Sequence, residues 1–312
     1  MRIKRLLPYV VGAAIAVTFP LWTGMYQQQV AVTILIYLTL ALSWDMLLRS
    51  GQLNFGTAGF FGIGSYTAVL LFLNLGVPPL LSIALGGLIA GVVALFLGLA
   101  VLRLRGMYFA ITTLGVASIF QVVARNIPSL TGGPEGKMLP TAIFRGNVSM
   151  AYWLVLGVAL LAVVVSEVFE RTRVRLALTS MRNNEWVARS SGIDVFKYLV
   201  FMFTVTSIIQ GIAGGTYAHV YGFVAPEATF HVNFLLLPLA MALLGGIYGT
   251  WGPVIGALIL GILSEYLKLQ IPYGHLLVYG GIIVVVTLFA PHGVVGLVKA
   301  GLQKWAAERG PR

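Results

Sequence analysis

The side chains that could do chemistry in this chain are few, and their positions narrow what they could do. The sequence has nine acidic residues and four histidines among 312 residues. Every carboxylate lies in a loop, in a tail or near the end of an apolar segment. A charge near the centre of a membrane-spanning helix costs at least about 2.5–3.5 kcal/mol and usually marks a proton or ion pathway. The usual residues of proton-driven transport are therefore missing, whereas sodium coupling through backbone carbonyls stays open. The acidic residues are Asp45, Glu135, Glu167, Glu170, Glu185, Asp194, Glu227, Glu265 and Glu308.

Asp45 and Glu265, each near the end of an apolar segment, have a basic residue within one helical turn. Asp45 precedes Arg49 by four residues, and Glu265 precedes Lys268 by three. At these spacings side chains on a helix are neighbours. We therefore predict local ion pairs at both places.

No pattern typical of an enzyme or a metal site stands out. His219, Glu227 and His231 share a predicted loop over 219–232, but their spacing matches no standard zinc site, so we interpret them as surface polar residues. Residues 131–138 are similar to a phosphate-binding loop, with one residue too few between the glycines and a methionine where Ser or Thr should follow the lysine. The chain has no cysteine. We predict no catalytic residue, no metal site, and no ATP or other cofactor bound by this chain.

The charged stretch 183–192 stands between long apolar segments. Val174, Leu178, Met181, Glu185 and Ala188 follow one another at helical spacing, so they share one helix face. Gly192 then ends the predicted helix, as a C-terminal glycine commonly does. Glu185 thus lies on an otherwise apolar face, and two interpretations stay open. It pairs locally with Arg189 or Arg182, or the apolar stripe docks into a groove on another subunit, where Glu185 meets a basic or amide group.

Composition indicates the elements that position these residues. The chain is 59% hydrophobic and 9% charged, with a mean hydropathy of +0.94, whereas a soluble domain carries about 25% charged residues. Spanning the hydrocarbon layer takes about 20 apolar helical residues. We predict an all-α transmembrane bundle of eight to ten spans, of which the eighth and ninth form a bent pair or a re-entrant hairpin. The candidate spans are 6–24, 29–48, 56–74, 80–101, 107–125, 150–168, 197–218, 233–249, 252–267 and 275–291.

The Lys and Arg residues predict how this bundle is oriented. With the N-terminus inside, sixteen of the twenty basic residues fall on the cytoplasmic side, and only Arg125, Lys137, Arg145 and Lys268 fall outside. We expect one integral domain over 1–312, both termini in the cytoplasm, an outer (periplasmic) loop at 126–149 and a cytoplasmic loop at 169–196. The net charge of +11 is then explained by the membrane topology and by attraction to anionic lipids, and not by nucleic-acid binding.

Glycines crowd the entrance of the third span. Asn54, Gly56, Gly59 and Gly62 lie there, and such density is typical of a broken helix whose freed backbone groups line a polar cavity. Ordinary tight packing explains the density equally well. Small-xxx-small pairs elsewhere predict close helix approaches; they are Gly87/Gly91, Gly211/Gly215, Gly245/Gly249 and Gly252/Gly256.

The pattern Glu185-x-x-Ala188-x-x-x-Gly192 resembles the EAA loop of permease subunits in binding-protein-dependent ABC importers. Trp186 and Val187 depart from it, because the general motif often has alanine there. Residues 53–66, 105–110, 130–136 and 245–253 resemble, in the expected order, segments of LivM-type permeases of branched-chain amino-acid importers. The EAA-like pattern is moderately specific, whereas the ordered set is strongly so.

This resemblance implies a non-catalytic permease subunit in the bacterial inner membrane. It implies as partners a second, homologous permease, two cytoplasmic ATPases that bind ATP and Mg²⁺, and a periplasmic protein that delivers leucine, isoleucine or valine. The helix ending at Gly192 would be the coupling helix, oriented by Glu185, and the outer loops 126–149 and 219–232 would contact the delivery protein. The residues expected to contribute to ATPase coupling are Glu185, Ala188, Gly192, Arg182 and Asn184.

Other functions stay open. An importer of urea or short amides has the same architecture, and no selectivity residue can be located in the sequence. A secondary transporter or channel would work without an ATPase and would tolerate changes at Glu185. A membrane-embedded enzyme has no catalytic arrangement to support it.

Overall fold

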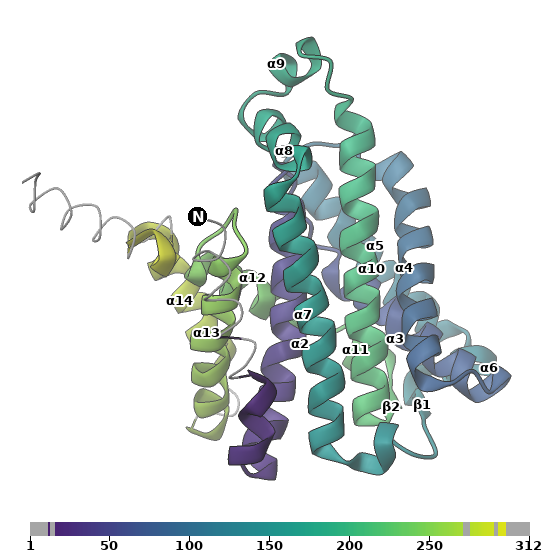
Figure 1. The fold of residues 1–312 in the computed structure, drawn as a ribbon. Coiled ribbons are helices and arrows are strands. Elements are labelled where there is room, and N and C mark those ends of the chain that lie inside the picture. Colours follow the sequence, from purple (N-terminus) through teal and green to yellow (C-terminus); the bar gives the residue numbers. More distant parts are fainter. Residues whose placement is uncertain (1–11, 13–15, 271–274, 290–292, 298–312) are drawn as a thin grey trace, which may run out of the picture.

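The computed structural model describes residues 12, 16–270, 275–289 and 293–297, and it is a bundle of helices (Figure 1). Seven helices in this part of the chain are long and apolar enough to cross a membrane, one of them counted over Pro226–Gly245, and Trp251–Leu267 is a shorter apolar helix. The predicted all-α, multi-pass membrane class is confirmed. The main helices of the bundle are α2 (Met25–Leu48), α3 (Thr57–Leu75), α4 (Pro79–Val101), α5 (Met107–Asn126), α7 (Val148–Arg171), α10 (Val195–Tyr221), α12 (Asn233–Gly245), α13 (Trp251–Gln270) and α14 (His275–Phe289).

Most predicted spans agree with these helices to within a few residues. The first predicted span, 6–24, falls largely outside the described residues, although 16–22 is helical. The eighth and ninth spans are α12 and α13, which pack against each other and are joined by residues 246–250. Pro238 lies inside α12, where a proline removes a backbone hydrogen bond and favours a bend.

Helix α10 lies at the centre of the bundle and contacts α2, α3, α4 and α7. Glycines allow these close approaches, as the small-xxx-small pairs predicted. A Cβ added to Gly87 or Gly91 would meet Ile208 or Ile212 of α10, and one added to Gly211 would meet Ala90 and Gly87 of α4. Backbone-to-backbone contact of this kind is how helices associate in lipid, where burial of apolar surface gives little driving force.

Gly211→Ala is expected to destabilise the bundle, because the new methyl group would push α10 away from α4. Overpacking of this kind typically costs about 1–3 kcal/mol. Gly115→Ala in α5 is the matched control, since its Cβ would enter open space and alanine improves helix propensity by about 1 kcal/mol. Thermal melting in detergent should show a lower midpoint for the first variant and an equal or higher one for the second. Equal midpoints would contradict the packing argument.

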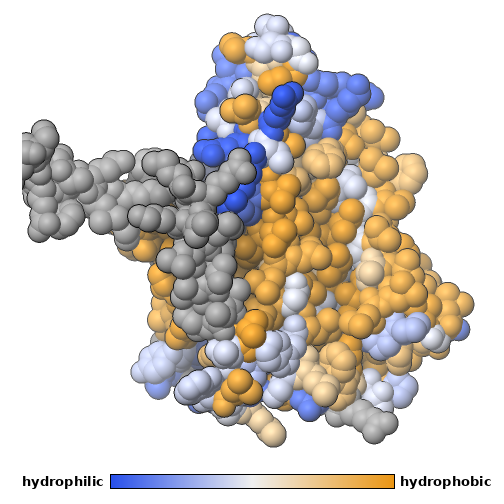
Figure 2. All heavy atoms as spheres, viewed as in Figure 1, coloured by the Kyte–Doolittle hydropathy of each residue, from blue (hydrophilic) through white to orange (hydrophobic). Residues whose placement is uncertain are grey.

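The two ends of the bundle differ in charge. One end carries the short helices α8 (Arg173–Asn183) and α9 (Glu185–Ser190); we call it the α8–α9 end, and it is the hydrophilic upper part in Figure 2, above apolar sides. Basic residues of the described chain gather there, in agreement with the predicted grouping. They are Arg49, Arg103, Arg105, Arg171, Arg173, Arg175, Arg182, Arg189 and Lys197.

At the opposite end two loops meet in a small antiparallel sheet, and we call it the β1–β2 end (Figure 1). Lys137 of β1 (Lys137–Met138) pairs with Val224 of β2 (Phe223–Val224), which joins the predicted outer loops 126–149 and 219–232. These loops also hold α6 (Pro128–Thr131), α11 (Pro226–Thr229) and the 3₁₀ turns η1 (Gly133–Glu135) and η2 (Ile143–Gly146).

Candidate functional site at the α8–α9 end

The connection between α7 and α10 folds as two helices instead of the single helix predicted from the stripe between Val174 and Ala188. The break is at Asn184, whose backbone is extended (φ −159°). Its side-chain oxygen accepts hydrogen bonds from the backbone N–H groups of Trp186 (3.0 Å) and Val187 (3.2 Å). Asparagine is among the best N-cap residues because it satisfies these otherwise unpaired donors. The apolar periodicity of the segment conceals this cap.

Gly192 ends α9, as the sequence predicted. Its φ is +81°, a conformation that glycine adopts without strain. Its N–H donates to the Arg189 carbonyl (3.0 Å) and the Ile193 N–H donates to the Ala188 carbonyl (3.1 Å), which together form a Schellman motif. Asp194 then caps α10, and the hydrogen bond from the Lys197 side chain lowers the pKa of its carboxyl group.

The predicted docking of the apolar stripe onto another subunit is wrong. Leu178, Met181 and Ala188 are all buried against the core of their own chain. Periodicity indicates that a face is covered but not which surface covers it. The apolar side chains left exposed on α8 and α9 are Leu176 (70%), Trp186 (80%) and Val187 (58%). Two of them are the departures from the EAA-like pattern, and nothing in the stripe itself pointed to them.

Glu185 ties α9 to a second loop of the chain. Its carboxylate pairs with Arg189 (2.6 Å), as the local interpretation predicted, and also with Arg105 in the connection between α4 and α5 (2.8 Å). The sequence could not show the second pair, because Arg105 lies 80 residues away. Arg182 does not pair with Glu185 in the structure; its guanidinium lies 3.8 Å from the centre of the Tyr248 ring, a cation–π contact.

Beneath α8 a network of charges joins α2, α7 and the loop between α12 and α13. The predicted Asp45–Arg49 ion pair is confirmed (2.9 Å), and both side chains are buried. Arg49 also donates to the Ser166 hydroxyl (2.8 Å) and lies 3.6 Å from Glu170. For the predicted Glu265–Lys268 pair, the side chain of Lys268 lies outside the described residues.

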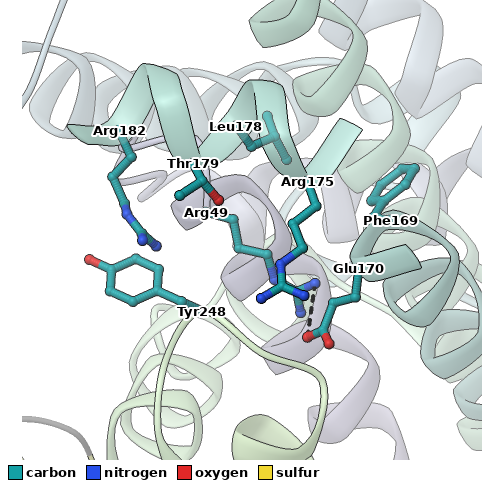
Figure 3. Close-up of a pocket in the computed structure, with 8 residues that line it drawn as sticks. All are labelled: Arg49, Phe169, Glu170, Arg175, Leu178, Thr179, Arg182 and Tyr248. Carbon is teal, nitrogen blue, oxygen red and sulfur yellow. Dashed lines mark ion pairs between the residues drawn. The ribbon is translucent and has the colours of Figure 1, made fainter. Parts of the chain in front are cut away.

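The same carboxylates hold the loop between α12 and α13. Asp45 accepts from the Tyr248 N–H (2.6 Å), and Glu170 accepts from the Thr250 N–H (2.7 Å). Tyr248 has a φ of +70°, which is strained for a residue with a side chain. Side chains of this network and of α8 line a hollow of about 120 Å³ (Figure 3); they are Arg49, Phe169, Glu170, Arg175, Leu178, Thr179, Arg182 and Tyr248. The network therefore gives the α12–α13 loop a fixed position under α8.

The glycine-rich entrance of the third span is a non-helical segment, residues 51–56, followed by α3. The side-chain oxygen of Asn54 accepts a hydrogen bond from the Gly56 N–H (2.8 Å), and the backbone carbonyl of Asn54 accepts one from the Trp44 indole (2.8 Å). A Cβ on Gly59 would meet Ala117 of α5, and one on Gly62 would meet the Phe230 ring. Gly59 and Gly62 thus pack tightly, and their cavity role stays a prediction.

The interpretation of His219 as a surface residue is wrong. It lies in α10, is buried, and its Nε2 is 2.8 Å from the Ser82 hydroxyl. The apolar run of α10 simply extends further than predicted, to Tyr221. Within the described part of the chain, no three His, Cys, Asp or Glu residues form a group that could hold a metal.

The multi-pass helical bundle, with its apolar helices long enough to cross a membrane, defines the class of an integral membrane protein. The model of the family described as "Branched-chain amino acid transport system / permease component" matches residues 27–287, and the chain belongs to this family. It is a family of ABC-transporter permease subunits.

Named proteins that are similar to this chain agree with this family assignment. The chain is 28% identical to the high-affinity branched-chain amino acid transport system permease protein LivM of Escherichia coli (strain K12), over 96% of this chain and 77% of that protein. It is also 28% identical to LivM of Salmonella typhimurium, over 93% and 74%. The nucleoside ABC transporter permease protein NupC of Lactococcus lactis is 27% identical over 69% of this chain and 72% of NupC.

Proposed function

We propose that this chain is one of two permease subunits of an ABC importer that moves leucine, isoleucine and valine across the bacterial inner membrane. The observation that carries the proposal is the family match, together with the two LivM relatives that cover nearly the whole chain. The urea or short-amide alternative has no named relative among those compared. The more limited similarity to a nucleoside permease makes substrate choice the part to test.

We place the α8–α9 end in the cytoplasm and the β1–β2 end in the periplasm. The gathering of basic residues at the α8–α9 end supports this orientation. The loop over 126–149 would then face the periplasmic binding protein, and 169–196 would face the ATPases. Both termini would lie in the cytoplasm.

We further propose that α9 is the coupling helix and docks in a groove of one of the two ATPases, which bind ATP and Mg²⁺. Trp186 and Val187 form its exposed apolar tip. Asn184, Ala188 and Gly192 shape the helix, through its cap, its buried face and its end. Glu185 pairs with Arg105 and Arg189, and Arg182 lies over Tyr248. A push on α9 would thus reach both the α4–α5 connection and the α12–α13 loop.

Affinity purification of the tagged chain from its native host, after crosslinking, tests the assembly. We expect a second permease and two ATPases to co-purify, and we expect proteoliposomes of this complex with its binding protein to take up labelled leucine only with ATP. Recovery alone, or uptake without an ATPase, would favour a secondary transporter or channel. Uptake of urea or a nucleoside in place of leucine would overturn the substrate assignment.

Trp186→Ala is expected to weaken the association with the ATPase. Truncating a central aromatic anchor of an interface costs about 2 kcal/mol or more, about thirtyfold in affinity, and Trp186 is 80% exposed in the isolated chain. Trp153→Ala, on the exposed surface of α7, is the matched control. Quantitative pull-down of ATPase per permease measures the effect. Equal recovery from both variants would show that Trp186 is not an anchor.

A further inference from the structure

Two hollows lie one after the other on the same side of the bundle. The first has a volume of about 320 Å³ and is lined by residues that include Ser118, Gln121 and His231. The second has a volume of about 510 Å³ and is lined by residues that include Trp44 and Tyr248. Both volumes fall in the range of about 300–1,000 Å³ typical of small-molecule sites.

The hollows approach opposite ends of the molecule. Gln121, in the first, hydrogen-bonds to Glu227 of α11 at the β1–β2 end (3.0 Å). Tyr248, in the second, belongs to the charge network at the α8–α9 end. One face of α12 runs along both, because Leu235 lines the first hollow while Leu239 and Leu243 line the second. These leucines are four residues apart, so they form a continuous aliphatic stripe.

Phe55 belongs to the walls of both hollows. It is partly buried and packs against the buried cluster that contains Trp44 and Leu235, and these two residues line the second and the first hollow respectively. It stands in the non-helical segment 51–56, between α2 and the start of α3. Its ring is thus in a position to separate two spaces that would otherwise form one furrow along the bundle.

The segment that carries Phe55 is held by few hydrogen bonds. The Phe55 N–H donates to the Thr113 hydroxyl (3.0 Å), and the Trp44 indole donates to the Asn54 carbonyl (2.8 Å). Three polar atoms in the same stretch are buried without a hydrogen-bond partner: Oε1 of Gln52, Nδ2 of Asn54 and Oγ1 of Thr57. Unpaired buried polar groups cost about 1–3 kcal/mol each. Partners gained by these groups would offset part of the cost of moving the segment.

We propose that the two hollows are the outer and inner halves of a solute path, and that Phe55 is the barrier between them. The inference rests on the proposed function, namely that this chain lines a path for a small amino acid. The aliphatic stripe on α12 suits the side chain of such a solute, and the unpaired groups of Gln52, Asn54 and Thr57 suit its ammonium and carboxylate. Movement of residues 51–57 would take the ring aside and turn these groups towards the solute.

Cysteine accessibility tests the barrier without reference to the solute, and the chain contains no cysteine. Ser118→Cys reports on the outer hollow, Leu243→Cys on the inner one, and Leu161→Cys, on the exposed surface of α7, is the control. The assembled complex, in vesicles of each orientation, is treated with a charged methanethiosulfonate that does not cross the membrane. We expect the first position to react only from the side of the β1–β2 end, the second only from the other side, and Leu161→Cys to react slowly from both.

Phe55→Ala added to each reporter is expected to let the reagent reach it from both sides, with at least a tenfold faster reaction from the formerly closed side. Phe96→Ala, at an exposed phenylalanine of α4, should leave the pattern unchanged. An unchanged pattern with Phe55→Ala, in a complex that still assembles, would overturn the proposal. If the pattern changes as expected but the wild-type complex takes up no branched-chain amino acid, the substrate assignment fails and the barrier stands.

Phe55→Trp gives the opposite perturbation. A larger ring should slow leucine uptake at least tenfold while the ATPases still co-purify and hydrolyse ATP. Uptake at the wild-type rate from both the alanine and the tryptophan variants would also overturn the barrier.

Discussion

Glu185→Arg is expected to reduce ATP-driven leucine uptake to the level seen without ATPases, while the protein still folds and inserts into the membrane. The substitution removes the pairs with Arg105 and Arg189 and places three guanidinium groups together. Because Glu185 is 31% exposed and its partners are 36% and 55% exposed, the loss of stability should stay near or below about 1 kcal/mol per pair. The loss of position should matter more, because α9 would no longer be fixed to the α4–α5 connection.

Parallel measurements of ATP hydrolysis and leucine uptake in proteoliposomes separate a loss of protein stability from a loss of the position of α9. The double variant Glu185→Arg with Arg105→Glu reverses the longer-range pair and should recover part of the uptake. Arg189→Ala, which removes only the local pair, should have a smaller effect than Glu185→Arg. Normal uptake by Glu185→Arg would show that the coupling role proposed for this residue is wrong.

The helices were predictable because hydrophobic length is a local property. The apolar runs gave the spans to within a few residues over most of the described chain, and the glycine pairs on α4 and α10 gave their close contact. A membrane-spanning helix must satisfy its backbone hydrogen bonds internally, so each run specifies its own structure. No knowledge of distant residues is needed.

The partners of the site residues were not predictable in the same way. The stripe through Leu178 and Ala188 correctly indicated a covered face, but its cover is the chain's own core. Likewise Tyr248 donates to Asp45 from 203 residues away, a separation about which local spacing gives no information. His219 was misplaced because a single histidine in an apolar run looks like a loop residue, whereas Ser82 satisfies it inside the bundle.

The local structure of the site also depends on single side chains whose hydrogen bonds compete with the helix that the apolar periodicity predicts. Asn184 breaks a helix that periodicity alone would continue, because its side chain satisfies two N–H groups of the next turn. The same argument applies to residues 51–56, where glycine density left broken-helix and tight-packing interpretations equal. The structure shows the tight packing, since Gly59 lies closely against α5, whereas the cavity role of the segment stays a prediction.

Arg49→Met should have the largest effect on stability of any single change discussed here. It would leave the carboxylate of Asp45 in a fully buried position without its ion-pair partner, and breaking a buried pair in this way typically costs about 3–5 kcal/mol. Ser166 and Glu170 would also lose their contact with the guanidinium. Melting in detergent and the yield of assembled complex measure the loss.

Two further variants show whether the stability loss of Arg49→Met comes from the unpaired, buried carboxylate of Asp45. Arg171→Met breaks an (i, i+4) pair with Glu167 whose arginine is 51% exposed, and such a surface pair contributes at most about 1 kcal/mol. Asp45→Asn combined with Arg49→Met removes the stranded charge and keeps an oxygen for the Tyr248 N–H, so it should melt above Arg49→Met alone. Equal melting of Arg49→Met and Arg171→Met would show that the buried network does not hold the loop. If the double variant regains stability without regaining uptake, the Asp45–Arg49 ion pair serves transport as well as folding, because Asp45 holds the strained loop at Tyr248.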